Sequence, residues 1–369
     1  MFINRLLGMV AFLTLFITFG CDAQLSFDQS TVFRRAQSLD NGISISWLEQ
    51  TWNADILEKA IIKVSDLKLL KQLGFKSIRL PVAFEYFQNN HTPETKVIQR
   101  IDEIFKFCQL YGFKLIICYH SGDLNENTYS AETPRVIDLW TKLAKKYKTQ
   151  SADNLFFELY NEPPHMNPDI WTNAANNIIS AIRKIDKNRT LIVGASNFNS
   201  IYELSRTGPL MDNNIIYTFH FYEPFFFTHQ GADWVGDQVS TTGVPFPYNA
   251  QTFPPLNERA KGTPGDANYH KYNKDGNEQS VNDKLMIVKK WAQKNNVPLL
   301  CSEYGVYNKY ADLDSRCRYI KAVRQTLKAL KIPGIMWDYN SNFSIFNGEP
   351  ALVNLPDCMQ DAIGFTAKK

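Results

Sequence analysis

The sequence has almost no excess of charge of either sign and no run of basic residues. Its 369 residues carry 40 Lys and Arg against 37 Asp and Glu, which gives a formal net charge of +3. Nucleic-acid-binding domains neutralise phosphates with a basic patch, and no basic cluster interleaved with aromatic residues occurs along this chain. We therefore expect no nucleic-acid partner.

Several catalytic signatures are also missing from the chain. It has neither the Gly-x-Ser-x-Gly elbow of serine esterases nor the His-Glu-x-x-His pair of zinc hydrolases. Its six cysteines do not follow the spacing of a zinc site. These absences argue against a serine esterase or a metal-dependent deacetylase, and we expect no metal and no cofactor.

Long apolar runs are scarce, and the exception lies at the amino terminus. Arg5 precedes an apolar stretch over 6–19, and Cys21-Asp22-Ala23 supplies small residues before Gln24. This pattern predicts a signal peptide over residues 1–23 and a secreted or periplasmic protein. An uncleaved anchor and a lipidated Cys21 stay open as alternatives, although the run is short for a bilayer span.

Few cysteines remain once Cys21 is set aside. The five others are an odd number, so at least one thiol is free, and their pairing stays open. Cys118 and Cys301 lie within apolar, strand-like runs, which predicts that they are small core residues.

The composition, 44% hydrophobic and 21% charged, is that of a globular protein. No linker or repeat divides residues 25–369, so we expect one catalytic domain and a monomer.

Segments rich in strand-forming residues alternate with amphipathic segments along this domain. Such alternation predicts an α/β protein with a parallel sheet, and eight strands are the number in a (β/α)8 TIM barrel. The predicted strands are Gly42–Trp47, Lys76–Val82, Lys114–His120, Leu155–Asn161, Thr190–Ala195, Ile215–Tyr222, Pro298–Glu303 and Ile332–Asp338.

The predicted helices are marked by apolar residues at helical spacing and by end signals. Gly74 and Gly112 follow two of them in the position that ends a helix, and Thr133-Pro134 reads as an N-cap followed by a first-turn proline. A short closing helix is expected near the end. The helical segments are Ile56–Leu73, Ile98–Cys108, a helix from Pro134 through Ala144, Val281–Lys294, Ser315–Leu330 and part of Leu352–Ile363.

One region interrupts the regular spacing. Residues Glu223–Gln279 are rich in Pro, Gly, Asn and aromatics, which predicts a long ordered loop after the sixth strand. Such a loop lies at the carboxyl face of a barrel, where active sites of this fold are built. Trp234 is a candidate substrate-binding platform, whereas the neighbouring phenylalanines are expected to pack within the loop.

Two acidic residues stand where predicted strands end. Glu162 closes Asn-Leu-Phe-Phe-Glu-Leu-Tyr-Asn-Glu-Pro, and Glu303 closes Val-Pro-Leu-Leu-Cys-Ser-Glu-Tyr-Gly. Because the carboxyl ends of barrel strands converge on one mouth, the two side chains are expected to meet in space. A protonated and an ionised carboxyl group are the minimum equipment for cleaving a glycosidic bond.

These motifs resemble glycoside hydrolase family 5, a cellulase-like family of clan A that includes many retaining cellulases and mannanases. Asn161-Glu162-Pro163 is similar to its acid/base motif, and Ser302-Glu303-Tyr304-Gly305 is similar to its nucleophile motif. The resemblance implies that Glu162 is the acid/base, that Glu303 is the nucleophile, and that the family's other active-site positions bind substrate. Those positions are Arg79, His120, Asn161, His220, Tyr222 and Trp337.

The resemblance implies a retaining, endo-acting β-glycosidase whose partner is a polysaccharide or oligosaccharide. A β-1,4-glucan is the expected substrate; mannan, xyloglucan and short oligosaccharides stay open, as does a non-catalytic carbohydrate-binding barrel. On neighbouring loops, nothing in the sequence distinguishes Asp123, Glu126, Asn197 and Asn199 from solvated loop residues.

Overall fold

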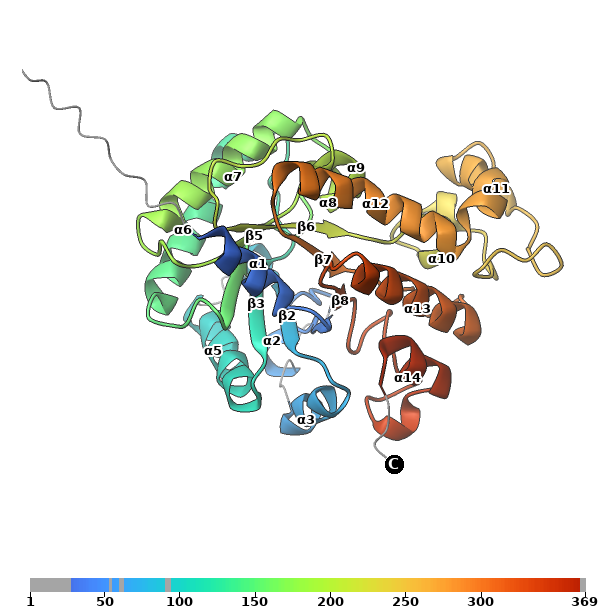
Figure 1. Ribbon diagram of the computed structural model, residues 1–369, viewed down its shortest axis with the longest axis horizontal. Helices are drawn as coiled ribbons and strands as arrows, with labels where there is room; N and C mark the ends of the chain where they lie inside the picture. Colours follow the sequence, from blue (N-terminus) through green and yellow to red (C-terminus); the bar gives the residue numbers. More distant parts are fainter. Residues whose placement is uncertain (1–27, 53–54, 60–62, 90–93, 366–369) are drawn as a thin grey trace, which may run out of the picture.

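The computed structural model describes residues 28–52, 55–59, 63–89 and 94–365. The predicted signal peptide lies outside these residues. Eight parallel strands run in the order β7-β6-β5-β4-β3-β2-β1-β8. A parallel bridge between Cys301 and Gly334 joins β7 to the segment before β8, so that the sheet nearly closes into the expected barrel (Figure 1).

Each strand is shorter than its sequence pattern, and in most of them the residues lost are at the carboxyl end. Polar residues that follow the paired segments are thereby left at the mouth of the barrel. The strands are β1 (Gly42–Ser44), β2 (Ser77–Val82), β3 (Lys114–Tyr119), β4 (Leu155–Glu158), β5 (Leu191–Val193), β6 (Ile215–His220), β7 (Leu299–Glu303) and β8 (Ile335–Met336).

Helices follow the strands and cover the outside of the barrel. They are α1 (Gln29–Gln37), α2 (Ile56–Lys59), α3 (Val64–Gln72), α4 (Phe84–Asn89), α5 (Glu94–Tyr111), α6 (Tyr129–Tyr147), α7 (Pro168–Arg183), α8 (Ser196–Asn199), α9 (Ile201–Leu204), α10 (Phe225–Thr228), α11 (Pro264–Asp275), α12 (Glu278–Asn295), α13 (Leu313–Ala329) and α14 (Asp357–Ile363). Short 3-10 turns are η1 (Asp237–Val239), η2 (Glu258–Ala260) and η3 (Leu352–Asn354).

The core has two layers because side chains alternate between the two faces of each strand. In β3, Ile116 lies inside the barrel, whereas Leu115 and Ile117 pack against the surrounding helices. Val32 and Ala36 of α1 join the inner layer, so this helix covers one end of the barrel (Figure 1). The sequence analysis did not predict α1.

The structure corrects two helix predictions. The pattern over Ile56–Leu73 is divided into α2 and α3. Helix α6 starts at Tyr129, and Pro134 lies within it, so Thr133-Pro134 is not its start. The physical reason is that Thr128 accepts the first amide hydrogen bonds at its carbonyl, while the Thr133 hydroxyl donates to the Tyr129 carbonyl at 2.6 Å.

The region predicted as a long ordered loop follows the sixth strand as expected. It contains α10, η1, η2 and α11, and the part around α11 extends away from the barrel (Figure 1). Phe226 and Phe227 within it are buried, as expected for packing residues. Its aromatic residues contact one another: the rings of Phe253 and Tyr272 stack with centroids 5.4 Å apart. Phe226, Phe227 and Tyr272 belong to the same apolar cluster as the outer layer of the barrel, so the loop is packed onto the barrel.

A disulfide bond joins α13 to α14 through Cys317 and Cys358, which are 41 residues apart. The other cysteines of the described residues, Cys108, Cys118 and Cys301, are free and buried. Burial of Cys118 and Cys301 agrees with the core positions predicted from the sequence. The pairing was left open because spacing alone does not identify partners.

Replacing Cys358 by Ser should lower the free energy of unfolding by about 3–4 kcal/mol, because the opened loop restores conformational freedom to the unfolded chain. Chemical denaturation of the oxidised proteins measures the difference. Wild-type protein unfolded under reducing conditions is the matched control and should behave like the variant. Coincident unfolding curves for the oxidised wild type and the variant would show that the bond does not stabilise the fold.

Candidate active site

The residues singled out at the strand ends meet at the carboxyl mouth of the barrel. Register explains one pair: His220 at the end of β6 is opposite Glu303 at the end of β7. The backbone amide of Asn161 donates to the Tyr119 carbonyl at 2.8 Å, which holds the segment after β4 against β3. The structure thus brings together residues that are far apart in sequence.

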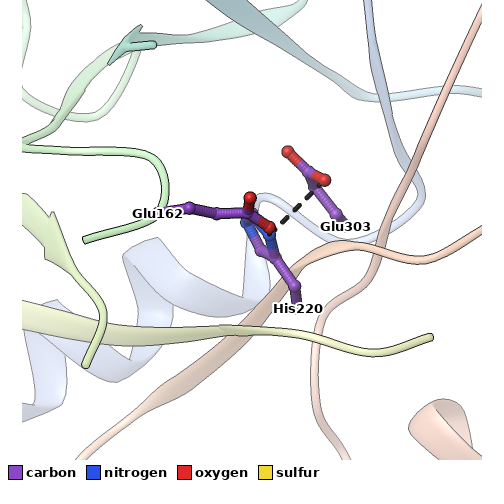
Figure 2. A group of neighbouring side chains, drawn as sticks. All are labelled: Glu162, His220 and Glu303. Carbon is purple, nitrogen blue, oxygen red and sulfur yellow. Dashed lines mark hydrogen bonds and ion pairs between the residues drawn. The ribbon is translucent and has the colours of Figure 1, made fainter. Parts of the chain in front are cut away.

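The two candidate catalytic carboxyl groups face each other across an imidazole ring (Figure 2). One ligand-type atom from each of Glu162, His220 and Glu303 lies within 4.8 Å of the others. Carboxyl groups stand about 5–5.5 Å apart in retaining glycosidases and about 6.5–9.5 Å apart in inverting ones. The spacing therefore fits direct attack by one carboxylate, as in the retaining class.

The Glu303 carboxylate is held from two sides. Arg79 Nη1 lies 2.6 Å from its Oε1, and the Tyr222 hydroxyl donates to Oε2 at 2.8 Å. Burial raises the pKa of Glu303 above its usual range, and the charge of His220, the charge of Arg79 and the Tyr222 hydrogen bond oppose that shift. These contacts fix the carboxylate in one position and stabilise its ionised form.

Arg79 is itself held by a buried network. Its guanidinium donates to Glu158 from Nε at 2.6 Å and from Nη2 at 3.0 Å. Nη2 also donates to Asn161 Oδ1 at 2.7 Å and to Cys118 Sγ at 3.2 Å. Arg79 and Glu158 are fully buried, so each charge depends on the other. The network holds the Arg79 guanidinium in the position from which it contacts Glu303.

Sequence reasoning missed Glu158 and the contact that Cys118 makes in this network. A usable signal existed, because inward-facing positions recur every second residue along a strand. Phe156 lies inside the barrel, so Glu158 two residues later faces inward as well. In the same way Thr218 follows Ile216, and its hydroxyl donates to Ser302 Oγ at 2.6 Å. A polar layer thus lies above the apolar layer of the barrel.

His220 lies between the two carboxyl groups. Its Nδ1 is 2.6 Å from Glu162 Oε1 and 3.4 Å from Glu303 Oε2. Burial by itself lowers the pKa of His220, but Glu303 and Glu162 outweigh it, so that the pKa is raised above the usual value. The raised pKa favours the protonated imidazole, whose charge offsets the repulsion between the two acids, and the Nδ1 contact orients Glu162.

His120 has a different environment. Burial, Arg79 and His220 lower its pKa to about 3, so the ring is neutral. It stacks on Trp337 with ring centroids 5.8 Å apart and planes inclined by 7°. The Arg79 guanidinium also lies near the Trp337 ring, 5.9 Å from its centroid. The contacts with His120 and Arg79 hold the Trp337 ring in place, so that it presents a flat apolar surface to the cleft.

A cleft of about 580 Å³ contains this chemistry. Trp234 lines it and is 58% exposed, packed edge-on against Tyr307 with centroids 4.9 Å apart. Trp52, which sequence reasoning missed, lines it too and is 71% exposed. The lining residues are Glu49, Trp52, His120, Asn161, Glu162, Tyr222, His229, Trp234, Glu303, Trp337, Ser341, Asn342 and Phe343.

Glu49 is a third acid in the cleft, and sequence reasoning missed it. Its Oε2 is 3.7 Å from His120 Nε2, and the residue is 7% exposed. Burial first, then the carboxylates of Asp338 and Glu303, raise the pKa of Glu49 to about 8. It therefore carries a proton at neutral pH and offers a hydroxyl donor to the cleft.

Protonation of Glu49 should make stability depend on pH. The pKa of Glu49 in the folded protein, about 8, lies above the ordinary value of 4.5. The stabilisation of the folded protein that comes from this difference is therefore complete below about pH 4.5 and is lost as the pH rises through 8. Between pH 6 and 9 the free energy of unfolding of the wild type should fall by on the order of 2 kcal/mol more than that of Glu49→Gln. Denaturant unfolding at each pH measures this.

Glu258→Gln is the matched control, because the Glu258 side chain is 82% exposed and pairs with neighbouring Lys261 at the surface. It should follow the wild-type pH profile. Parallel profiles for wild type and Glu49→Gln would mean that Glu49 does not titrate in this window.

The group Glu162, His220 and Glu303 also contains atoms of the kind that bind metal ions. Both Glu303 oxygens already accept hydrogen bonds, and the Arg79 charge lies 2.6 Å from one of them. A guanidinium so close opposes a cation at the same oxygen. The arrangement suits a pair of acids better than a metal centre.

The loop residues Asp123 and Glu126 are exposed, as expected, and Asn197 is half-buried. Asn199 differs from the prediction because it is fully buried, and its Nδ2 donates to the Asn161 carbonyl at 3.3 Å. No sequence pattern marked it, since the contact depends on how the segment after β5 folds back.

Within the described part of the chain, none of the helices is both long enough and apolar enough to span a bilayer.

Comparisons with known proteins agree with this geometry. Residues 40–343 match the family model of cellulase, glycosyl hydrolase family 5. The chain is 31% identical to endoglucanase 3 of Fibrobacter succinogenes, covering 89% of this chain but only 54% of that protein, so it spans about half the length of that relative. It is 29% identical to endoglucanase C of Acetivibrio thermocellus, covering 78% of this chain and 86% of that one.

Solved structures give the same result. The fold is similar to Thermotoga maritima Cel5A in complex with cellobiose, with a TM-score of 0.74 and 25% identity over 90% of this chain and 99% of that one. The same protein in complex with mannotriose gives a TM-score of 0.73 at 25% identity, with the same coverage of both chains.

Proposed function

The chain belongs to glycoside hydrolase family 5, and on that premise we propose that it is a retaining, endo-acting β-1,4-glucanase. The observation that supports the proposal is the position of two carboxyl groups, Glu162 after β4 and Glu303 at the end of β7. One oxygen of each and one nitrogen of His220 lie within 4.8 Å of one another. That spacing suits double displacement, in which one acid is nucleophile and the other is acid and then base.

In the first step, an oxygen of Glu303 attacks the anomeric carbon while Glu162 donates its proton to the leaving glycosidic oxygen. The bond from the anomeric carbon to that oxygen breaks, and a covalent glycosyl-Glu303 ester forms. Arg79 and Tyr222 hold the nucleophile in line, at 2.6 Å and 2.8 Å from its two oxygens. The Glu162 side chain is 34% exposed, so it reaches the leaving group from the open side of the cleft.

In the second step, Glu162 is ionised and takes a proton from a water molecule. The water oxygen attacks the anomeric carbon, the ester bond breaks, and Glu303 leaves as a carboxylate. Two inversions at one carbon give net retention of configuration.

The remaining cleft residues bind the substrate. Asn161 Oδ1 accepts from Arg79, which fixes the amide so that its NH2 end is the donor to a sugar hydroxyl. The supported face of Trp337 suits the apolar face of a sugar ring. Trp234 and Trp52 extend this aromatic surface with exposed rings. Neutral His120 and protonated Glu49 supply further hydrogen-bonding groups.

A panel of soluble polysaccharides tests the proposal. Purified protein is incubated with carboxymethyl cellulose, mixed-linkage β-glucan, xyloglucan, mannan and xylan, and viscosity is followed together with reducing ends. We expect hydrolysis of the β-1,4-glucans with an early fall in viscosity, since internal cuts shorten chains faster than end-wise cuts. Proton NMR of the first products should show the β-anomer.

Other outcomes contradict the proposal in distinct ways. A preference for mannan would favour a β-mannanase, a candidate supported by the mannotriose complex of the similar structure. First-formed α-anomer would exclude retention. Binding without hydrolysis of any polysaccharide would point to a non-catalytic barrel.

We also propose that the protein is exported and acts as a monomer. The Cys317–Cys358 bond supports export, since disulfides persist in oxidising compartments. Mass spectrometry of the protein recovered outside the cytoplasm should find Gln24 as the first residue, and light scattering should give one chain per particle. Full-length protein retained in the cell, or a lipid on Cys21, would contradict simple secretion.

A further inference from the structure

Strand β8 is the shortest strand of the barrel, and its ladder with β1 ends early. The last pair of that ladder is Ile43 with Met336. Beyond it, the Tyr339 amide donates to the Ser44 carbonyl at 3.0 Å, and the two chain segments then continue as loops. Both loops contribute residues to the cleft. The contacts that join the loops beyond the ladder therefore shape the site.

The side chain of Asp338 makes such a contact, and it is fully buried. Its Oδ2 accepts a hydrogen bond from the Ser46 hydroxyl, in the loop after β1. Its Oδ1 accepts from the Ser341 amide at 3.0 Å and from the Ser341 hydroxyl at 2.8 Å, in the loop after β8. Each carboxyl oxygen thus holds one of the two loops.

The loop after β1 is fixed from both sides. Leu48 in this loop bridges to Val82 of β2, which anchors the loop on one side. On the side of β8 the anchor is the bond from Ser46 to Asp338. The Ser46 carbonyl accepts from the Glu49 amide at 3.3 Å, so the same anchor holds the part of the loop that brings Glu49 into the cleft.

A carboxyl group at this place has to overcome the cost of leaving water. Burial raises the pKa of Asp338 to about 6, and the hydrogen bonds from Ser46 and Ser341 oppose that shift. At neutral pH the group is therefore mostly ionised, and its charge strengthens the bonds that it accepts. An apolar side chain would avoid the cost of burial but would join neither loop.

We infer that Asp338 is a positioning residue, which locks the loop carrying Glu49 to the loop after β8 and thereby sets the shape of the substrate cleft. The inference rests on the proposed function, because it takes this cleft as the place where the polysaccharide binds. Other residues hold the two catalytic acids: Arg79, Tyr222 and His220. Asp338 therefore acts on substrate binding more than on the chemical step.

Steady-state kinetics on cellohexaose and on 2,4-dinitrophenyl β-cellobioside test the inference. Asp338→Ala should raise KM roughly fivefold to twentyfold and leave kcat within about threefold of the wild type, because a looser cleft weakens ground state and transition state alike. Asp338→Asn should restore KM to near the wild-type value, since its amide accepts from Ser341 and donates to the Ser46 oxygen. Ser46→Ala should raise KM in the same direction, and it tests the lock even if Asp338→Ala does not fold.

Asp186→Ala is the matched control, because Asp186 is also a buried carboxyl group with several hydrogen bonds. It accepts from the amides of Asn188 and Arg189, each at 3.0 Å, and it precedes β5 at the amino end of the barrel. This variant should lower the melting temperature without changing KM. Thermal unfolding of every variant separates loss of the fold from loss of binding.

The charge of Asp338 provides a second readout. The charged groups around Glu49 are Asp338, Glu303 and Arg79, and neutral His120 lies 3.7 Å from it. The Asp338 carboxylate favours the protonated form of Glu49, whose pKa is about 8. In Asp338→Asn, the pH at which the Glu49-dependent fall in stability levels off should therefore move below the wild-type value.

Three results would overturn the inference and leave the proposed function intact. The first is a KM in both Asp338→Ala and Ser46→Ala equal to that of Asp186→Ala. The second is a loss in Asp338→Asn as large as that in Asp338→Ala, and the third is a pH profile of Asp338→Asn that coincides with the wild-type profile. A wild type that cleaves neither substrate would overturn the proposed function and this inference together.

Discussion

Glu303→Gln should reduce kcat on both aryl cellobioside and polysaccharide by on the order of 10⁴–10⁶-fold. An amide has no negative charge with which to attack the anomeric carbon, so no ester forms. The fold should survive, because glutamine has the same shape and its Oε1 still accepts from Arg79, which keeps its pairing with Glu158. Thermal unfolding followed by circular dichroism checks that the loss is chemical.

Glu258→Gln is the matched control for Glu303→Gln, since it removes the same charge from an exposed side chain. It should retain wild-type turnover. A 2-deoxy-2-fluoro-cellobioside with a good leaving group should trap the ester, and peptide mass mapping should find the label on Glu303. Substantial turnover in Glu303→Gln, or a label on another residue, would remove the basis of the proposed mechanism.

Glu162→Ala should show an effect that depends on the leaving group. Polysaccharide needs protonation of its leaving oxygen, so kcat/KM should fall by about 10²–10⁴-fold. A 2,4-dinitrophenolate leaves without a proton, so formation of the ester from the dinitrophenyl substrate should be slowed much less. The ester then accumulates, because no base activates the water, and a burst of dinitrophenol should precede a slow steady state.

Azide provides the decisive measurement for Glu162. A small anion needs no general base, so it should restore turnover of Glu162→Ala on the dinitrophenyl substrate and give the β-glycosyl azide. Glu126→Ala, at an exposed position on the loop after β3, is the control and should show neither a burst nor azide activation. Equal losses on the two substrates, without azide rescue, would argue that Glu162 is not the proton donor.

Much of the fold followed from local pattern. Apolar strand segments alternate with segments whose apolar residues recur at helical spacing. Each observed strand lies inside its predicted range, from Gly42 in β1 to Met336 in β8. Gly74 and Gly112 have positive φ values of 88° and 69°, as their positions after helices predicted. Such signals are local because backbone conformation and side-chain period act over a few residues.

The errors had both local and distant causes. The proline at 134 suggested a helix start, but the hydrogen bonds of Thr128 begin α6 earlier. Asn199 gave no signal, since its burial depends on Gly194 and on the Asn161 carbonyl across two strands.

The sequence by itself determined the order of strands and helices, the resemblance to family 5, and which polar residues stand at strand ends. Only the tertiary structure decided the distances among Glu162, His220 and Glu303, the burial that raises the pKa of Glu49, and the network that aims Arg79. The physical reason is that period and propensity are encoded in neighbouring residues. Charge interactions and desolvation depend on atoms that closure of the barrel brings together.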